Sequence, residues 1–162
     1  SIVDQVFLLY AGYGEAQYAP EWTIWPCEGK LSNFAGMTSL PQYNGMTINT
    51  FACSCELHSN KGSQLDGIGT ICHEISHCMG LPDFYNTSDM TDFCMDAFEL
   101  MDQGAYNGNS YSPAAYTGYE RWVCGWREPV ELRDTCTITG WLPLVSGGET
   151  YILYNEANSN ED

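Results

Sequence analysis

Short apolar runs separated by turn-forming residues predict strands in the first and last parts of the chain. Residues 6–10 form a continuous apolar run that Gly12 ends, which is typical of a buried strand. Residues 46–57 alternate apolar and polar positions over part of their length, which predicts a second strand. Two shorter strand patterns lie near the end of the chain, at 135–139 and 150–154.

The apolar positions of residues 67–79 recur with the period of a helix. At about 100° per residue, one apolar stripe lies within roughly 60° of a common direction; it consists of Ile68, Ile71, Cys72, Ile75 and Met79. His73 and His77 point the opposite way. We therefore expect a helix that packs on a core through its apolar stripe and lines a cleft with its histidines.

A second helix is predicted over residues 113–124. Ser112 is placed to cap its start, Pro113 suits the first helical position, and Gly125 follows where a helix commonly ends. Apolar and aromatic residues recur along it at helical spacing, which favours packing on a core over an aromatic binding surface.

The stretch His73-Glu74-Ile75-Ser76-His77 carries the clearest chemistry. Residues four apart lie one above the other on a helix, so His73 and His77 can present ring nitrogens to one Zn²⁺. Glu74 lies beside them, where its carboxylate can take a proton from a water that the zinc activates for attack on a peptide carbonyl. The remaining histidine, His58, is expected in a surface loop.

A sharp turn after this helix is expected to return a third ligand to the metal. Gly80 follows His77 by three residues, where the chain needs a residue that tolerates positive φ, and Pro82 prevents the helix from resuming. Asp83 is thereby carried back towards the histidines. Three protein ligands that leave a position for water are typical of a catalytic zinc site, since structural zinc sites use four.

The stretch from His73 to Asp83 has the His-Glu-x-x-His-x-x-Gly-x-x-Asp form of metzincin peptidases. Together with the Leu81-Pro82-Asp83-Phe84-Tyr85 continuation, it resembles the M6 family of secreted bacterial metalloproteases similar to immune inhibitor A. The segment from Glu99 to Gly104 resembles the Met-turn of that family. The resemblance is strongest over residues 65–126 and weaker over residues 6–14.

The resemblance implies a fold, a set of site residues and cofactors. The fold would be α+β and metzincin-like, with a mixed sheet and the active-site helix in an upper lobe (about 1–80). A loop-rich lower lobe (about 81–162) would carry the C-terminal helix. His73, His77 and Asp83 would bind zinc, Glu74 would be the catalytic base and then the proton donor, and Gly80 and Met101 would support the site. Calcium is a further candidate cofactor, without assignable ligands.

The resemblance also implies how substrate binds, and the chain departs from the family pattern in two ways. In metzincins an edge strand above the cleft pairs with the substrate backbone, and we expect that strand within residues 46–57. Cys72 and Cys78 flank the two histidines, but Cys72 lies roughly 100° from His73 around the helix and Cys78 points away from the histidine side, so neither is expected to bind the metal. Few residues precede the zinc helix, so we expect the chain to be an N-terminally truncated fragment.

Length and charge narrow the class of protein. At 162 residues, of which 44% are hydrophobic, the chain can bury a core and is expected to form one domain. Five basic against twenty-one acidic residues give a formal charge of −16, which opposes binding to nucleic acids and to anionic lipid headgroups. No apolar run is long enough to span a bilayer.

The eight cysteines favour an oxidising compartment, outside the cell, at its surface or in the periplasm, although they also permit a cytosolic protein with free thiols. Cys72 and Cys78 cannot bridge each other, because six helical residues separate them by about 9 Å. The pairing of the cysteines stays open, since eight cysteines allow about 105 pairings.

These observations predict a secreted, monomeric zinc endopeptidase that cleaves protein or peptide substrates. Two alternatives stay open. One is a catalytically silent zinc-binding module for adhesion or assembly, derived from a protease, although Glu74 would have no use in it. The other is a dormant enzyme, in which N-terminal elements are missing or a cysteine such as Cys27 is bound to the zinc.

Overall fold

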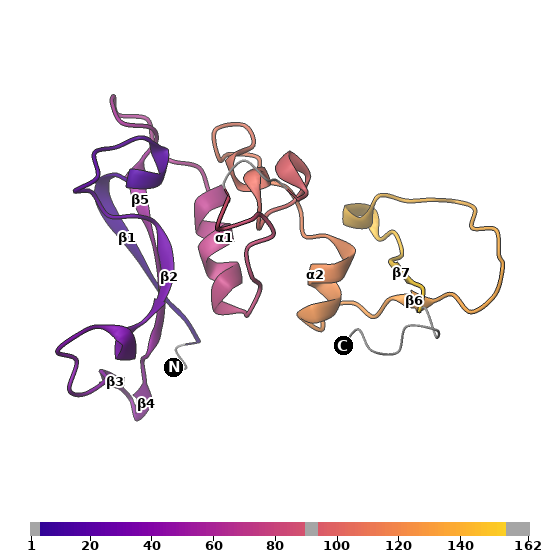
Figure 1. Ribbon diagram of the computed structural model, residues 1–162, viewed down its shortest axis with the longest axis horizontal. Coiled ribbons are helices and arrows are strands. Elements are labelled where there is room, and N and C mark those ends of the chain that lie inside the picture. The colour runs from indigo at the N-terminus through magenta and orange to yellow at the C-terminus, as the bar shows by residue number, and fades with distance from the viewer. Residues whose placement is uncertain (1–3, 90–93, 155–162) are drawn as a thin grey trace. The chain divides into compact units, whose positions relative to one another are not determined.

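The structure is a computed structural model that describes residues 4–89 and 94–154. The chain divides into two compact units, residues 1–114 and 115–162. The described residues form a three-stranded mixed sheet, two small two-stranded sheets and two α-helices (Figure 1). The expected α+β class with a mixed sheet is confirmed, whereas one domain of two lobes, about 1–80 and 81–162, stays a prediction.

The main sheet of the first unit has the order β1-β5-β2, with β1 at Val6–Tyr13, β5 at Thr50–Leu57 and β2 at Cys27–Lys30. β5 runs parallel to β1 and antiparallel to β2. Four consecutive residues of β5, from Ala52 to Cys55, are buried. β5 is therefore the central strand of this sheet. The expectation that residues 46–57 hold the edge strand of the cleft is wrong for residues 50–57, which form β5. β2 is an edge strand of this sheet instead.

The pattern over residues 46–57 covers two strands rather than one. β4 (Met46–Thr47) forms a hairpin with β3 (Gln42–Tyr43), and β5 begins only at Thr50. The two residues between β3 and β4, Asn44 and Gly45, have φ values of 49° and 80°. Positive φ at both central residues is typical of the tight hairpin turns that Asn-Gly pairs favour.

Helix α1 spans Gly69–Cys78 and packs against β5, β2 and the 3₁₀-helix η4 (Gln103–Tyr106) (Figure 1). Its first turn lies against the backbone of the segment after η4: Gly69 N–H donates to the carbonyl of Ser110 at 2.9 Å. Gly80 ends the helix with φ of 96°, and Leu81 N–H then donates to the Ser76 carbonyl. This turn reverses the chain directly after the histidines.

The predicted burial of the apolar stripe of α1 is wrong at its two ends. Ile68 is 57% exposed and Met79 is 44% exposed. The middle of the stripe is half-buried, at Ile71, Cys72 and Ile75. The fully buried positions of the helix are small or polar, namely Gly69, Thr70, Glu74 and Ser76, which allows the backbones of its neighbours to approach closely.

The second unit contains helix α2 (Gly118–Val123) and a parallel pair of short strands, β6 (Val130–Glu131) and β7 (Tyr151–Ile152). The helix begins later than the predicted residue 113, because Thr117 and Glu120 form a reciprocal capping box at its start. The strand predicted at 135–139 is not formed, and β7 lies within the one predicted at 150–154. The remaining 3₁₀-helices are η1 (Glu15–Gln17), η2 (Leu31–Asn33), η3 (Asp96–Phe98) and η5 (Leu144–Ser146).

We predict that Gly69→Ala destabilises the protein, although alanine normally favours a helix over glycine by about 1 kcal/mol. A Cβ at this position would meet the Ala105 carbonyl oxygen at 1.8 Å, and backbone cannot move aside as a flexible side chain can. The expected loss is roughly 2–3 kcal/mol in the free energy of unfolding, measured by denaturant titration. An increase in stability would show that this close approach is absent.

Candidate functional site

Three ligand-type atoms from α1 and the turn after it converge on one point. His73 Nε2 and His77 Nε2 lie 3.2 Å apart. Asp83 Oδ1 lies 3.2 Å from the first nitrogen and 3.3 Å from the second. The helical spacing of the histidines and the reversal at Gly80 together produce this arrangement.

Backbone carbonyls set the orientation of both imidazole rings. His73 Nδ1 lies 2.9 Å from the Leu100 carbonyl oxygen, and His77 Nδ1 lies 2.7 Å from that of Leu81. A carbonyl oxygen can only accept, so each Nδ1 carries the proton and each neutral ring keeps a lone pair on Nε2. Such a second hydrogen bond is typical of histidines that bind metals.

The three atoms fit a tetrahedral metal ion. Ligand atoms about 2.0–2.1 Å from a tetrahedral zinc lie about 3.3–3.4 Å from one another, close to the three separations observed. Asp83 Oδ1 is buried and has no hydrogen-bond partner. Lone pairs of two imidazoles and a carboxylate directed at one point repel each other unless a cation lies between them. His73, His77 and Asp83 could therefore hold a metal ion.

The charges of the group favour an ionised carboxylate. Burial by itself would raise the pKa of Asp83, but its contacts with the His73 and His77 rings hold that pKa well below its usual range. Burial likewise disfavours the charged form of His77, yet the neighbouring Asp83 carboxylate raises the pKa of His77 on balance. The two shifts have one physical cause, which is the closeness of a negative oxygen to the two rings.

Glu74 is 7% exposed and lies between α1 and β2. Burial raises the pKa of its carboxyl, the two histidines lower it, Asp83 raises it, and a hydrogen bond from the Glu28 backbone N–H lowers it again, with a net increase. A buried carboxylate held by a backbone donor of the edge strand is well placed to exchange protons in the adjoining cavity.

The segment resembling a Met-turn supports the metal group through its backbone. Leu100 supplies the carbonyl that accepts from His73, and the Met101 carbonyl accepts from Phe84 N–H at 3.0 Å. The Met101 side chain is completely buried. Two consecutive carbonyls therefore join this segment to α1 and to the chain that follows Asp83.

The buried carboxylate of Asp102 holds this turn in shape. It accepts from Met95 N–H at 3.0 Å, from Asp96 N–H at 2.8 Å and from Gln103 N–H at 2.7 Å. Asp102 is 2% exposed. Three backbone donors thus depend on one side chain next to the Leu100 carbonyl.

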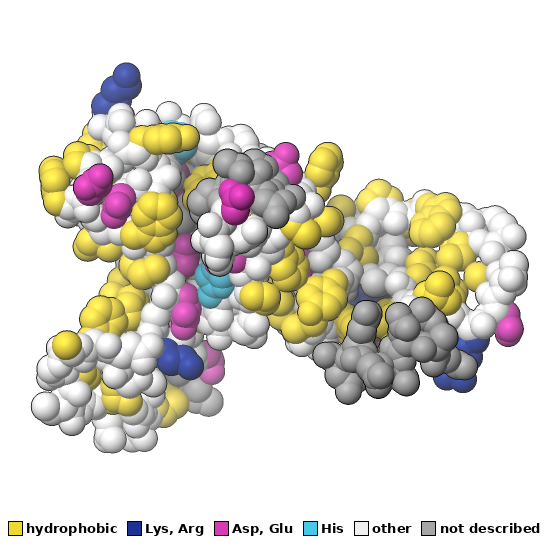
Figure 2. All heavy atoms as spheres, viewed as in Figure 1, with side chains coloured by type: hydrophobic (Ala, Val, Ile, Leu, Met, Phe, Trp, Pro, Cys, Tyr) yellow, Lys and Arg dark blue, Asp and Glu magenta, His cyan; other side chains and the backbone are white. Residues whose placement is uncertain are grey.

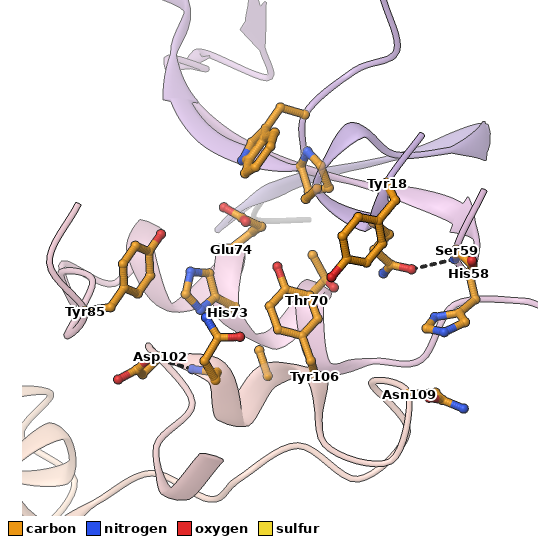
Figure 3. Close-up of a pocket in the computed structure, with 16 residues that line it drawn as sticks. Tyr18, His58, Ser59, Thr70, His73, Glu74, Tyr85, Asp102, Tyr106 and Asn109 are labelled. Carbon is orange, nitrogen blue, oxygen red and sulfur yellow. Dashed lines mark hydrogen bonds between the residues drawn. The ribbon is translucent and has the colours of Figure 1, made fainter. Parts of the chain in front are cut away.

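A cavity of about 430 Å³ adjoins the metal group, and His73 and Glu74 face into it (Figure 3). The rings of Tyr85 and Tyr106 lie on either side of them (Figure 3). The pKa of both phenols is raised, chiefly by burial, and that of Tyr106 reaches about 12, so both hydroxyls stay protonated. Neither tyrosine was expected to act in the site. The only available signal was that Tyr85 follows Asp83 by two residues.

His58 lies in the bend directly after β5, as the expected loop position requires, but it is half-buried. Its Nδ1 lies 3.0 Å from Asp66 Oδ1, and its side chain lines the far part of the same cavity. Asp66 also accepts from Gln17 Nε2 at 2.9 Å. Buried side-chain partners hold His58 in place, which the sequence pattern did not show.

The cysteines around the site are not part of the metal-holding group. Cys72 and Cys78 are half-buried on α1, and neither belongs to the group. Cys27 does not belong to it either, although it lines the cavity beside His77. Figure 2 shows acidic side chains and a histidine gathered on the surface between β2 and α1. The ligands that the structure brings together are thus nitrogen and oxygen atoms.

Comparison with known proteins identifies one family. The family model of the immune inhibitor A peptidase M6 catalytic domain matches residues 3–126, which is most of the chain and includes every residue of the metal group. No curated protein matches the chain. The family match confirms the resemblance deduced from the sequence motifs.

We predict that Asp102→Ala lowers the free energy of unfolding by about 3 kcal/mol, because it removes the charged acceptor of three part-buried N–H groups. Thermal unfolding monitored by circular dichroism measures the loss. Glu21→Ala, which removes an exposed carboxylate, is the control and should change stability by about 0.5 kcal/mol or less. Equal stability of the two variants would contradict the role of Asp102.

Proposed function

Since the chain belongs to the peptidase M6 family, whose members are metallopeptidases, we propose that it is a zinc-dependent endopeptidase that hydrolyses internal peptide bonds of proteins. The observation that carries the proposal is the convergence of His73, His77 and Asp83 at tetrahedral separations, with Glu74 beside them. The same residues form the metzincin zinc motif.

In this proposal His73, His77 and Asp83 hold the zinc. When bound, zinc lowers the pKa of water and polarises a carbonyl oxygen, which promotes hydrolysis. The Leu81 and Leu100 carbonyls keep the two rings oriented, and the Gly80 turn and the buried Met101 support them. The site is thus preorganised by backbone groups rather than by further charged side chains.

Glu74 is the proposed proton carrier. Its carboxylate takes a proton from the water that attacks the scissile carbonyl, and then donates it to the amine that leaves. Burial, which disfavours the charged carboxylate, favours the uptake of this proton from the water. Tyr85 and Tyr106 face the same cavity with protonated hydroxyls and are candidate donors to the developing oxyanion.

The edge strand β2 is the proposed docking strand for substrate. Cys27 and Glu28 of β2 line a cavity together with the metal group, and β2 pairs with β5 on one side only among the described residues. An extended peptide can add to such an edge and place one of its carbonyls beside the ligands. This gives the metzincin arrangement, with strands and α1 above the substrate and the segment after Asp83 below it.

The proposal also covers where the protein acts, its oligomeric state and its cofactors. We propose that the protein acts outside the cell as a monomer, since peptidases of its family are typically secreted. None of the described helices is long and apolar enough to cross a membrane. Calcium stays a candidate cofactor, but the described His, Cys, Asp and Glu residues form no second metal-holding group from which to choose its ligands.

The alternative is a catalytically silent zinc-binding module. It would need the three ligands but no carboxylate beside them. The buried position of Glu74 favours the enzyme, because an acidic side chain that is desolvated without a task costs stability.

We predict that Glu74→Gln lowers peptidase activity by about 10²–10⁴-fold while zinc content stays at the wild-type value. The measurement is cleavage of a diverse peptide mixture, read by mass spectrometry, with zinc quantified in the same samples. Glu28→Gln is the matched control, because Glu28 lines the same cavity but supplies only its backbone N–H to Glu74. If zinc-loaded wild-type protein cleaves no peptide, the proposal of an active enzyme is contradicted and the silent zinc-binding module is supported.

We further predict that His77→Ala and Asp83→Ala bind less than one zinc per chain after dialysis, whereas Cys78→Ala, on the same helix turn, binds one. Zinc should raise the thermal midpoint of the wild type, because a ligand that binds only the folded state stabilises it. Stoichiometric zinc binding to Asp83→Ala would exclude Asp83 as a ligand.

A further inference from the structure

Two cysteines face each other across the strand pair that borders the site. Cys27 of β2 is the register partner of Cys53 of β5. Their sulfur atoms lie 3.8 Å apart. Both residues belong to the part of the sheet that packs against α1.

We propose that Cys27 and Cys53 are a covalent modification site and form a cross-strand disulfide that ties β2 to β5. Directly opposed residues of antiparallel strands have Cα atoms about 4.5–5.5 Å apart. That separation lies within the roughly 4.4–6.8 Å that disulfides span. The bond therefore requires the two sulfurs to approach by side-chain rotation, without a change in strand register.

The environment of the pair disfavours a charged sulfur. Cys53 is 6% exposed. Burial, followed by the neighbouring Cys53, raises the pKa of Cys27 to about 12. A disulfide is uncharged, as are two thiols, so oxidation of the pair places no charge in this site.

Cys55 is the competing partner, since it lies on the same face of β5 two residues further on. Its register partner is Tyr10 of β1, and its sulfur packs against Gly14, where an added Cβ would lie 3.0 Å from it. Residues diagonal to each other across two strands are about 7–8 Å apart, beyond disulfide reach. The register therefore selects Cys53.

The oxidation balances with a small-molecule disulfide as oxidant. The Cys27 thiol loses its proton, and the resulting thiolate, which the raised pKa keeps scarce, attacks one sulfur of the oxidant; a mixed disulfide forms and one thiol is released. The Cys53 thiolate then attacks the Cys27 sulfur, and the second thiol leaves. The two protein thiols lose two electrons and two protons, and the oxidant becomes two thiols.

The disulfide would fix the strand that lines the cavity beside Glu74 and the metal group. Cys27 and Glu28 both line that cavity, so the bond restrains this wall of the site directly. The proposal does not depend on peptidase activity, because the distance and register that support it involve neither the metal group nor substrate.

The distribution of basic residues allows a direct test in the full chain. Cleavage after Lys30 and Lys61 gives a peptide 1–30 that contains Cys27 as its single cysteine, and a peptide 31–61 that contains Cys53 and Cys55. The protein is incubated with oxidised glutathione, its free thiols are blocked, and it is digested with trypsin without reduction. Mass spectrometry should find peptide 1–30 linked to peptide 31–61 in most molecules.

Two variants identify the sulfur involved. Cys55→Ser should retain the link, and Cys53→Ser should lose it. A blocked, unlinked Cys27 in the oxidised wild type, a link from Cys27 to another peptide, or a link that survives Cys53→Ser would each overturn the proposal. The wild type and Cys55→Ser suffice for a decision if Cys53→Ser fails to fold.

Stability supplies a second readout. Closing the loop between residues 27 and 53 restricts the unfolded chain, so reduction should lower the thermal midpoint of the wild type. In Cys27→Ser the difference between oxidised and reduced midpoints should shrink by roughly 10 °C. An unchanged difference would contradict a stabilising disulfide at this position.

Discussion

The mutual repulsion of three lone pairs is the constraint around which the first unit is organised. Two imidazole nitrogens and a carboxylate oxygen lie 3.2–3.3 Å apart, and none of the three offers a proton to the others when the rings are neutral. Such a group is unfavourable by itself and favourable around a cation. The surrounding backbone must therefore supply the order that the group cannot supply for itself.

That order comes from main-chain groups, most of them in segments distant in the sequence. The carbonyls of Leu81, in the turn after α1, and of Leu100 hold the rings, and the Ser110 carbonyl holds the start of α1. Main-chain partners are insensitive to side-chain substitution, so the arrangement depends on the path of the chain. Asp102 matters for the same reason, because it sets the path of the turn that carries Leu100.

The local chemistry of the site could be predicted from sequence because it rests on spacing within one helix and one turn. His73 and His77 are four residues apart, and Gly80 and Pro82 return the chain at a definite place. The strand partners could not be predicted, because pairing of β5 with β1 and β2 depends on contacts between distant segments. The exposure of Ile68 and Met79 at the two ends of the stripe of α1 was missed for a similar reason. Periodicity identifies an apolar stripe, but it does not show that Gly69 admits a neighbouring backbone at closer range. The start of α2 was missed because two N-terminal signals competed, and the reciprocal cap of Thr117 and Glu120 prevailed over Ser112-Pro113.

The pair of carbonyls at Leu100 and Met101 has a consequence for how this chain can diverge. Leu100 is joined to the ring of His73, and Met101 to the amide of Phe84, directly after Asp83. Because neighbouring peptide groups make these two hydrogen bonds, the two bonds fix the distance between the helix and the third ligand. Insertions or deletions can therefore accumulate between Tyr85 and Met95 without disturbing these two bonds. A single residue added just before Leu100 would displace both carbonyls from their hydrogen-bond partners at once.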